Sequence, residues 1–229
     1  MTGEGPIRAA LHNHTHFSPD SILSPERLVE RCLARKIGCI AVTDHNTIRG
    51  GIDVSKIVEE HQLEDLTVIV GEEVRSSEGE ILGLFLTEDI PRGLTGKQTI
   101  ERIKSQGGVV GVPHPFDCMR SALDYQRMLA LMDRIDFIET FNARIVFKSH
   151  NDEARRFAED NGLAKSAASD AHSPREIGRA YVEMAPFDGP TAFLDSLRKS
   201  LTAGRISSPL IHMVSRFAVI RRRLGWRPE

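Results

Sequence analysis

Short apolar runs alternate with helical patterns along almost the whole chain, and this alternation limits the fold more than any other feature. Residues 24–36 predict a helix in which Ser24 is the N-cap and Pro25 occupies the first helical position. The predicted strands cover residues 7–11, 39–43, 66–74, 80–87, 109–112, 135–140 and 164–168, with an edge strand at 181–184. Further helices are predicted over residues 51–62, 96–106, 121–133, 151–161 and 190–203. Strands that alternate with helices favour parallel pairing, because right-handed crossovers cover both faces of a sheet. The sequence therefore predicts an α/β fold, and six or seven such units fit a small TIM-like barrel better than an open sheet.

The length and charge of the chain restrict its organisation and its partners. With 229 residues and no repeat or long linker, we expect a single domain, residues 1–229, with a basic helical tail from about residue 205. Lys and Arg total 30 and Asp and Glu total 32, so a net charge of −2 argues against a surface built as a whole for nucleic acid. We also expect no membrane span, no secretory signal and a cytoplasmic location, because no apolar run approaches the ~18–20 residues of a spanning helix.

Metal-ligating residue types follow the predicted strands one after another. His12 and His14 come at the end of the first strand, where an alternation of side chains aims both imidazoles to the same side. The same position after later strands is held by His45, Glu73, His114, Asp170 and His172. The carboxyl ends of barrel strands converge on one face, where active sites are built. Burying these groups without a counterion would cost several kcal/mol, so we expect a cation among them rather than a solvated ring of polar loop residues.

The residues of these motifs and their order along the chain resemble those of a known family. The motifs are His12-Asn13-His14-Thr15 with Ser18-Pro19-Asp20, Thr43-Asp44-His45-Asn46-Thr47, Gly71-Glu72-Glu73, Pro113-His114-Pro115 and Ser169-Asp170-Ala171-His172. Together they resemble the PHP (polymerase and histidinol phosphatase) family over about residues 8–175. The resemblance implies a distorted (β/α)7 barrel with its metal site at the carboxyl ends of the strands. It also implies an enzyme, a metal-dependent phosphoric ester hydrolase, that holds two or three divalent ions (Mn²⁺, Fe²⁺ or Zn²⁺).

The resemblance also implies a ligand set. The first ion would be held by His12, His14, Glu73 and Asp170, and Glu73 would bridge to a second ion that His114 also binds. Asp20, His45 and His172 would hold the third. Some relatives have a further His between the Glu and His-Pro motifs, whereas residues 74–112 contain none, so we expect a thinner shell around the second ion. Glu72 would point away from the site, and Asp44 is a better candidate for orienting a neighbouring ligand than for binding metal.

The expected reaction is hydrolysis of a small phosphorylated metabolite or nucleotide through a metal-bridging hydroxide. Asp170, His172 and Arg144 are the candidate catalytic residues. Arg144 and Arg175 are the candidates for binding the substrate phosphate, because a guanidinium matches phosphate oxygens, although both could equally be ion-paired structural arginines.

Three other functions remain open from the sequence. One is a 3′–5′ nuclease acting on oligonucleotides, and another is a catalytically silent PHP scaffold or binding module. The third is an amidohydrolase-type hydrolysis of C–N bonds, because a barrel and divalent ions do not specify the bond that is cleaved. The segment 216–227 is basic with interleaved apolar residues. We expect it to be a helix packed on the barrel with its arginines toward solvent, and a helix that contacts a membrane surface or RNA is the alternative.

Overall fold

The computed structural model describes residues 5–226, and within them nine strands form one sheet. The strands are β1 (Ile7–Ala10), β2 (Cys39–His45), β3 (Thr67–Arg75), β4 (Glu80–Leu84), β5 (Val109–Val112), β6 (Phe137–Asn142), β7 (Ala164–Ala168), β8 (Ala180–Met184) and β9 (Leu201–Gly204). The helices are α1 (Pro25–Arg35), α2 (Arg49–Glu60), α3 (Gly96–Ser105), α4 (Tyr125–Leu131), α5 (Lys148–Asp160), α6 (Gly189–Arg198) and α7 (Ile211–Arg223), with a 3₁₀ turn, η1 (Met132–Arg134). The predicted helix starts at Ser24 and Thr95 are present, because each side chain accepts a hydrogen bond from the backbone N–H three residues on.

The sheet curls into a nearly closed barrel. Its order is β7-β6-β5-β4-β3-β2-β1-β8-β9, with β1–β2–β3 and β5–β6–β7 running parallel within each group. Beyond the strand ends, the Asp170 N–H donates to the His12 carbonyl at 3.0 Å, and the His14 N–H donates to the Ala171 carbonyl at 2.9 Å. These bonds join the segments that follow β1 and β7, so the site residues lie where the barrel closes. The predicted α/β barrel is confirmed.

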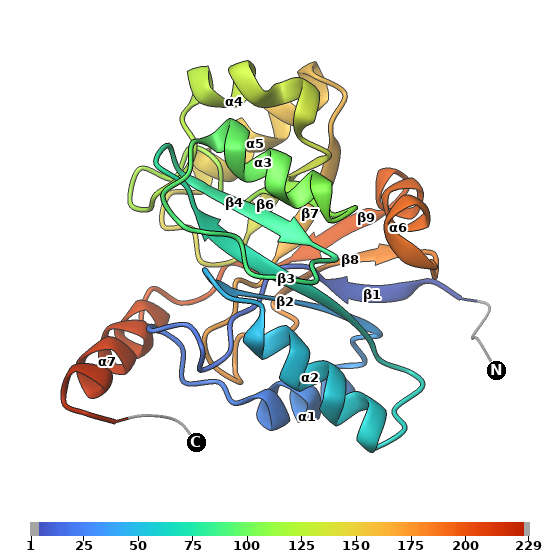
Figure 1. Ribbon diagram of the computed structural model, residues 1–229, viewed down its shortest axis with the longest axis vertical. Coiled ribbons are helices and arrows are strands. Elements are labelled where there is room, and N and C mark those ends of the chain that lie inside the picture. Colours follow the sequence, from blue (N-terminus) through green and yellow to red (C-terminus); the bar gives the residue numbers. More distant parts are fainter. Residues whose placement is uncertain (1–4, 227–229) are drawn as a thin grey trace.

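Helices cover the sheet on both sides. Figure 1 shows α3, α4 and α5 above the sheet and α1 and α2 below it, with α6 beside β8 and β9. One apolar core lies between the sheet and α3–α5, a second lies between the sheet and α1–α2, and a third fills the barrel around Phe137 and Phe193. The periodic apolar residues of the strands and helices are buried in these three cores.

The parallel pairing favoured by the sequence is interrupted in two places. β4 is antiparallel to β3, because the turn after Arg75 is too short for a parallel crossover, and β4 is also antiparallel to β5 on its other side. β8 is antiparallel to β1 and pairs on its other side with β9, so it is not an edge strand. The helix predicted over 190–203 ends at Arg198, and residues 201–204 form β9 instead because β8 offers them a strand to pair with.

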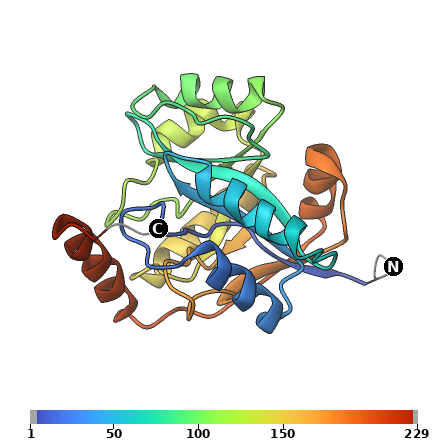
Figure 2. The ribbon, with the colours of Figure 1, turned by 60° about the horizontal axis from the view of Figure 1, so that its bottom comes forward.

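The last described element, α7, stands apart from the other helices at the periphery of the molecule (Figures 1 and 2). It covers most of the basic segment noted in the sequence, while Arg227 lies outside the described residues. Among the helices of residues 5–226, none combines the length and apolar character required to cross a bilayer.

Candidate metal centre

His12 and His14 lie just beyond the end of β1, and both rings turn an Nε2 atom into the same buried space. The His12 Nδ1–H donates to Glu139 Oε1 at 2.7 Å. The His14 Nδ1 lies 3.0 Å from Ser18 Oγ, whose own proton goes to Asp44 Oδ1 at 2.6 Å, so Ser18 accepts from His14. In each ring Nδ1 is engaged by a protein group, so Nε2 is the nitrogen directed toward a metal ion, and the two Nε2 atoms lie 2.9 Å apart.

Two carboxylates complete this group of ligand atoms. Glu73 Oε2 lies 3.4 Å from His12 Nε2 and 3.3 Å from His14 Nε2. Asp170 Oδ1 lies 3.4 Å from His14 Nε2 and 3.8 Å from His12 Nε2. Ligands bound about 2.1 Å from one ion are separated by roughly 3.0–3.4 Å in octahedral or tetrahedral geometry. His12, His14 and Asp170 offer ligand atoms that all lie within 4.8 Å of one another, which suits one divalent cation, and Glu73 Oε2 lies beside the two imidazole nitrogens.

Asp170 is held in place from behind. Its Oδ2 accepts hydrogen bonds from the Arg120 guanidinium and from Asn142 Nδ2, which leaves Oδ1 directed to the ligand group. Its backbone has a φ of 51°, a left-handed conformation that a non-glycine residue adopts at some cost. The strained backbone and the two donors orient one oxygen of this carboxylate toward the two histidines.

A second group of ligand atoms shares Glu73. Its other oxygen, Oε1, lies 3.0 Å from His114 Nε2, and Glu80 Oε2 lies 3.8 Å from the same nitrogen. Glu73 thus faces His12 and His14 with one oxygen and His114 with the other. A carboxylate placed in this way is suited to bridging two ions.

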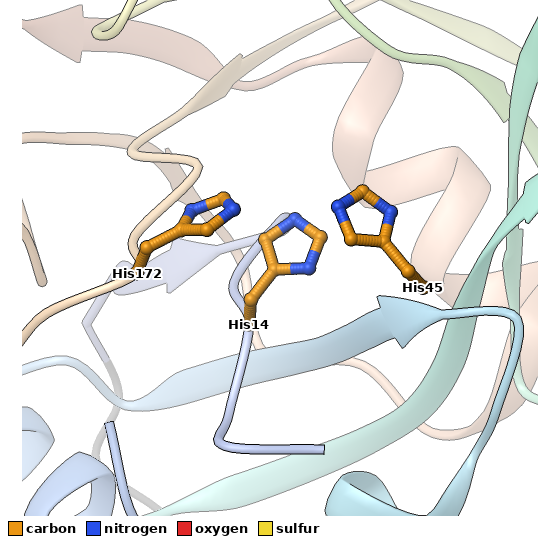
Figure 3. Close-up of side chains that lie close together, drawn as sticks. All are labelled: His14, His45 and His172. Atoms are coloured by element: carbon orange, nitrogen blue, oxygen red, sulfur yellow. The ribbon is translucent and has the colours of Figure 1, made fainter. Parts of the chain in front are cut away.

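A third group lies on the more exposed side of the cluster. Asp20 Oδ2 is 3.1 Å from His172 Nε2, and Asp20 Oδ1 is 3.6 Å from His45 Nε2. Figure 3 shows His14 between His45 and His172, with ring nitrogens of all three directed toward one another; each offers a nitrogen within 4.8 Å of those of the other two. The His172 Nδ1–H donates to the Asp170 carbonyl at 2.8 Å, which turns its Nε2 toward Asp20. All eight predicted ligands therefore lie in one continuous cluster.

The pKa values of His12 and His14 are shifted in directions that favour binding of a cation. Burial alone would lower the pKa of His12, but the carboxylates of Glu139, Asp170 and Glu73 outweigh burial and raise it well above its ordinary value. Burial and the charges of His172 and His45 hold the pKa of His14 well below its ordinary value, so its Nε2 keeps its lone pair. The negative potential around His12 and the unprotonated nitrogen of His14 are the conditions that a divalent ion requires.

Three residues of the centre were not expected from the sequence. Glu139 binds His12 Nδ1 and also accepts from the His114 N–H at 2.8 Å, so it orients two predicted ligands. Glu80 adds a carboxylate near His114, within the stretch that contains no histidine. Arg120 is the cation bound to Asp170. None of the three belongs to a motif, and the one sequence signal is that each lies in or close to a segment that carries a predicted ligand.

The two arginines predicted to bind phosphate have different contacts from those of Arg120. Arg144 is buried, with Nη2 2.8 Å from Ser215 Oγ, Nη1 3.3 Å from the Asp170 carbonyl and an ion pair to Glu176 at 3.4 Å. Arg175 is exposed on the segment after His172. The Arg144 guanidinium is thus largely engaged by protein groups.

The two glutamates of the Gly71-Glu72-Glu73 motif point in opposite directions, as expected. Glu72 Oε2 accepts from the Ile90 N–H at 2.9 Å, on the face of β3 away from the cluster. Asp44 likewise takes the expected orienting position, because its oxygens accept from the backbone and hydroxyl groups of Thr15 and Ser18.

The chain is similar in sequence and in fold to known proteins. A family model described as PHP-associated matches residues 148–205. Two relatives come from Methanocaldococcus jannaschii. The uncharacterized protein MJ1587 is 42% identical over 147 residues, which is 60% of this chain and 82% of that protein. The uncharacterized protein MJ0417 is 31% identical over 209 residues, which is 84% of this chain and 79% of that protein.

Solved structures share the fold at low sequence identity. PsfC from Pseudomonas syringae PB-5123 has a TM-score of 0.67 at 16% identity, over 96% of this chain and 99% of PsfC. The lesion-specific endonuclease PfuEndoQ from Pyrococcus furiosus has a TM-score of 0.66 at 18% identity, over 89% of this chain and 60% of the endonuclease. A protein from Bifidobacterium adolescentis, provisionally assigned as a metal-dependent phosphoesterase, has a TM-score of 0.61 at 17% identity, over 74% of this chain and 89% of that protein. With the matching family model and this fold, the chain belongs to the PHP family.

Proposed function

We propose that this protein is a metal-dependent phosphoesterase that hydrolyses a small phosphorylated metabolite or nucleotide. The observation that carries the proposal is the convergence of His12 Nε2, His14 Nε2 and Asp170 Oδ1 in one buried group, with Glu73 Oε2 within 3.4 Å of both imidazole nitrogens. Divalent ions held there would lower the pKa of a bound water and neutralise charge on phosphoryl oxygens. The proposal includes two or three bound ions, and these are Mn²⁺, Fe²⁺ or Zn²⁺.

The chain's own residues have distinct roles in this proposal. Glu139 fixes the ring of His12, and the Ser18–Asp44 pair fixes the ring of His14, so both nitrogens are oriented before any ion binds. Asp170 is a ligand whose second oxygen is neutralised by Arg120. We assign the phosphate-facing cation to Arg120, since it reaches the cluster directly, and give Arg144 the role of positioning the Asp170 backbone.

His172 and Asp20 form the exposed side of the cluster, where a substrate can approach. Asp20 is partly exposed, whereas His12 and His14 are fully buried. We place the substrate phosphate on this side, between His172 and Arg120. Arg175, exposed just beyond His172, remains a candidate for contacting the rest of the substrate.

The endonuclease fold neighbour supports a second candidate, a nuclease acting on oligonucleotides. The two candidates differ in the bond that is cleaved, a phosphomonoester or a phosphodiester. A comparison of p-nitrophenyl phosphate with bis(p-nitrophenyl) phosphate, and of nucleoside monophosphates with short oligonucleotides, separates them.

The proposal is tested by metal analysis and turnover of the wild type, Asp170→Asn and a matched surface variant, Asp195→Asn. We expect the wild type to bind more than about one Mn²⁺ per chain and to prefer the monoester. Asp170→Asn should lose at least ~10³-fold in turnover while remaining folded, because it removes a ligand and its charge. Asp195 is exposed and its replacement should change neither property. A folded wild type that binds no divalent ion and stays inert with Mn²⁺ would instead be a scaffold, and faster turnover of the diester would favour the nuclease.

A further inference from the structure

Helix α7 is attached to the protein by one face. Ser215 Oγ accepts from Arg144 Nη2 at 2.8 Å, and Ala218 is fully buried. Before the helix, the Ser207 N–H donates to the Ala143 carbonyl at 2.7 Å. This inner face lies beside the metal centre, because the Arg144 side chain that it contacts also donates to the Asp170 carbonyl.

The opposite face of α7 is an apolar stripe exposed to solvent. Met213, Phe217, Ile220 and Leu224 are each more than half exposed. Their spacing of four, three and four residues places them along one side of a helix. Leu210, at the start of the helix, is also exposed on this side. Four large apolar side chains in a row on one exposed face indicate a surface that is covered by a partner.

Positive charge borders the apolar stripe on both sides. At 100° per residue, Arg216 and Arg223 lie on one flank of the stripe and Arg221 on the other. Arg221 also stacks on the ring of Trp226, with its guanidinium carbon 3.9 Å from the ring centroid. Residues 205–226 contain five arginines and no Asp or Glu. The helix therefore presents an apolar stripe between two basic borders.

The apolar stripe and its basic borders distinguish between three kinds of partner. A second copy of the chain would bring arginine against arginine across a two-fold contact, with no acidic residue in either segment to offset the repulsion. A nucleic acid would match the arginines but would leave the apolar stripe in water. The surface of an anionic membrane matches both parts, because apolar residues insert at the acyl boundary while arginines meet the lipid phosphates.

We propose that α7 binds the surface of anionic membranes, with Met213, Phe217, Ile220 and Leu224 inserted and Arg216, Arg221 and Arg223 at the headgroups. The inner face keeps its contacts with Arg144, so the metal centre is held close to the lipid surface. This places the helix parallel to the membrane and does not require any segment to cross it.

The sole tryptophan of the chain, Trp226, gives a direct test because it follows α7 and stacks on Arg221. The full-length protein is titrated with vesicles of phosphatidylcholine alone and of phosphatidylcholine mixed with phosphatidylglycerol. We expect a blue shift of Trp226 fluorescence, and co-sedimentation, with the anionic vesicles only. Added salt should weaken the binding, because it screens the arginines.

Two variants and their matched controls locate the contact. Phe217→Ser and the double variant Arg216→Glu, Arg223→Glu should each lose vesicle affinity by at least about tenfold. Leu201→Ser removes an apolar side chain from β9 that is also more than half exposed, and Arg156→Glu reverses an exposed arginine on α5, so neither should change the affinity. Circular dichroism confirms that each variant is folded.

Three results would overturn the proposal. Equal binding to neutral and anionic vesicles would remove the role of the arginines. A wild-type dimer that Phe217→Ser dissociates, with no vesicle binding, would show that a second copy covers the stripe. A Trp226 response to a short oligonucleotide and none to vesicles would assign the arginines to nucleic acid.

Discussion

At the carboxyl end of β3, each face of the strand carries a buried glutamate, and the two glutamates have opposite surroundings. Glu73 points into the barrel, where histidines His12, His14, His45 and His114 approach its oxygens. Glu72 points outward, where its hydrogen bond comes from the Ile90 N–H. Both carboxylates are buried. Burial alone would raise the pKa of Glu73, but the charges of His12 and His45 outweigh burial and hold that pKa well below its ordinary value. Burial raises the pKa of Glu72 to about 8.

The difference shows that burial alone does not make a metal ligand. A carboxylate in the interior either meets positive charge and stays ionised or lacks it and holds a proton. The inner face of the barrel supplies converging nitrogen ligands, while the outer face supplies a packing layer. Three variants test this contrast, beginning with the largest expected effect.

Removing the charge of Glu73 should have the largest effect. In Glu73→Gln the side chain keeps its size but loses the negative charge that faces both ligand groups. We expect turnover of a phosphomonoester to fall by at least ~10³-fold and bound metal to fall with it. Glu72→Gln, one residue away on the other face, is the matched control and should retain both. Equal losses in the two variants would contradict the assignment of the inner face.

Glu139→Gln tests an orienting residue on the same inner face. The amide still fits beside His12 Nδ1, but it no longer holds the negative charge that favours the ring as a ligand. We expect a loss of about 10–100-fold in metal affinity, measured by competition with a chelator. Glu183→Gln, on the surface beside Arg8, is the control and should leave the affinity unchanged. An unchanged affinity in Glu139→Gln would show that the ring of His12 is held by packing alone.

The pH dependence of stability tests the outer face. Since the pKa of Glu72 is raised in the folded protein, the folded state holds its proton more tightly than the unfolded state. Its contribution to the unfolding free energy therefore falls as the pH rises from about 5 to 8, by on the order of 3 kcal/mol. Urea unfolding at both pH values should show that Glu72→Gln loses less stability over this interval than the wild type. A wild type and variant with the same pH dependence would show that Glu72 is ionised throughout.

Much of the secondary structure followed from local residues. Ser24 and Thr95 start α1 and α3 because their hydroxyls accept from backbone N–H groups within the same turn. β9 was missed because residues 201–204 pair with β8, and that pairing depends on how the sheet curls. Strands that gain their hydrogen bonds from a distant partner carry a weak local signal.

The residues of the site also divide into those that the local sequence predicts and those that depend on contacts across the fold. His12, His14, His45, His114, Asp170 and His172 could be found because each follows a predicted strand, and strand ends converge in a barrel. Glu139 and Arg120 could not, because their importance comes from contacts with His12 and Asp170 across the fold. Arg144 was predicted to bind the substrate phosphate because a guanidinium matches phosphate oxygens, but in the structure its guanidinium contacts Glu176 and Ser215, from two other segments.

By itself, the amino-acid sequence determined the alternation of strands and helices and put imidazoles and carboxylates at the strand ends, because both depend on local periodicity and residue type. The tertiary structure alone decided which oxygen of Glu73 and Asp170 faces which nitrogen, which protons the histidines hold, and which face of α7 remains in solvent. Those properties arise from pairs of groups far apart in the chain, whose distances and shared burial exist only once the barrel has closed.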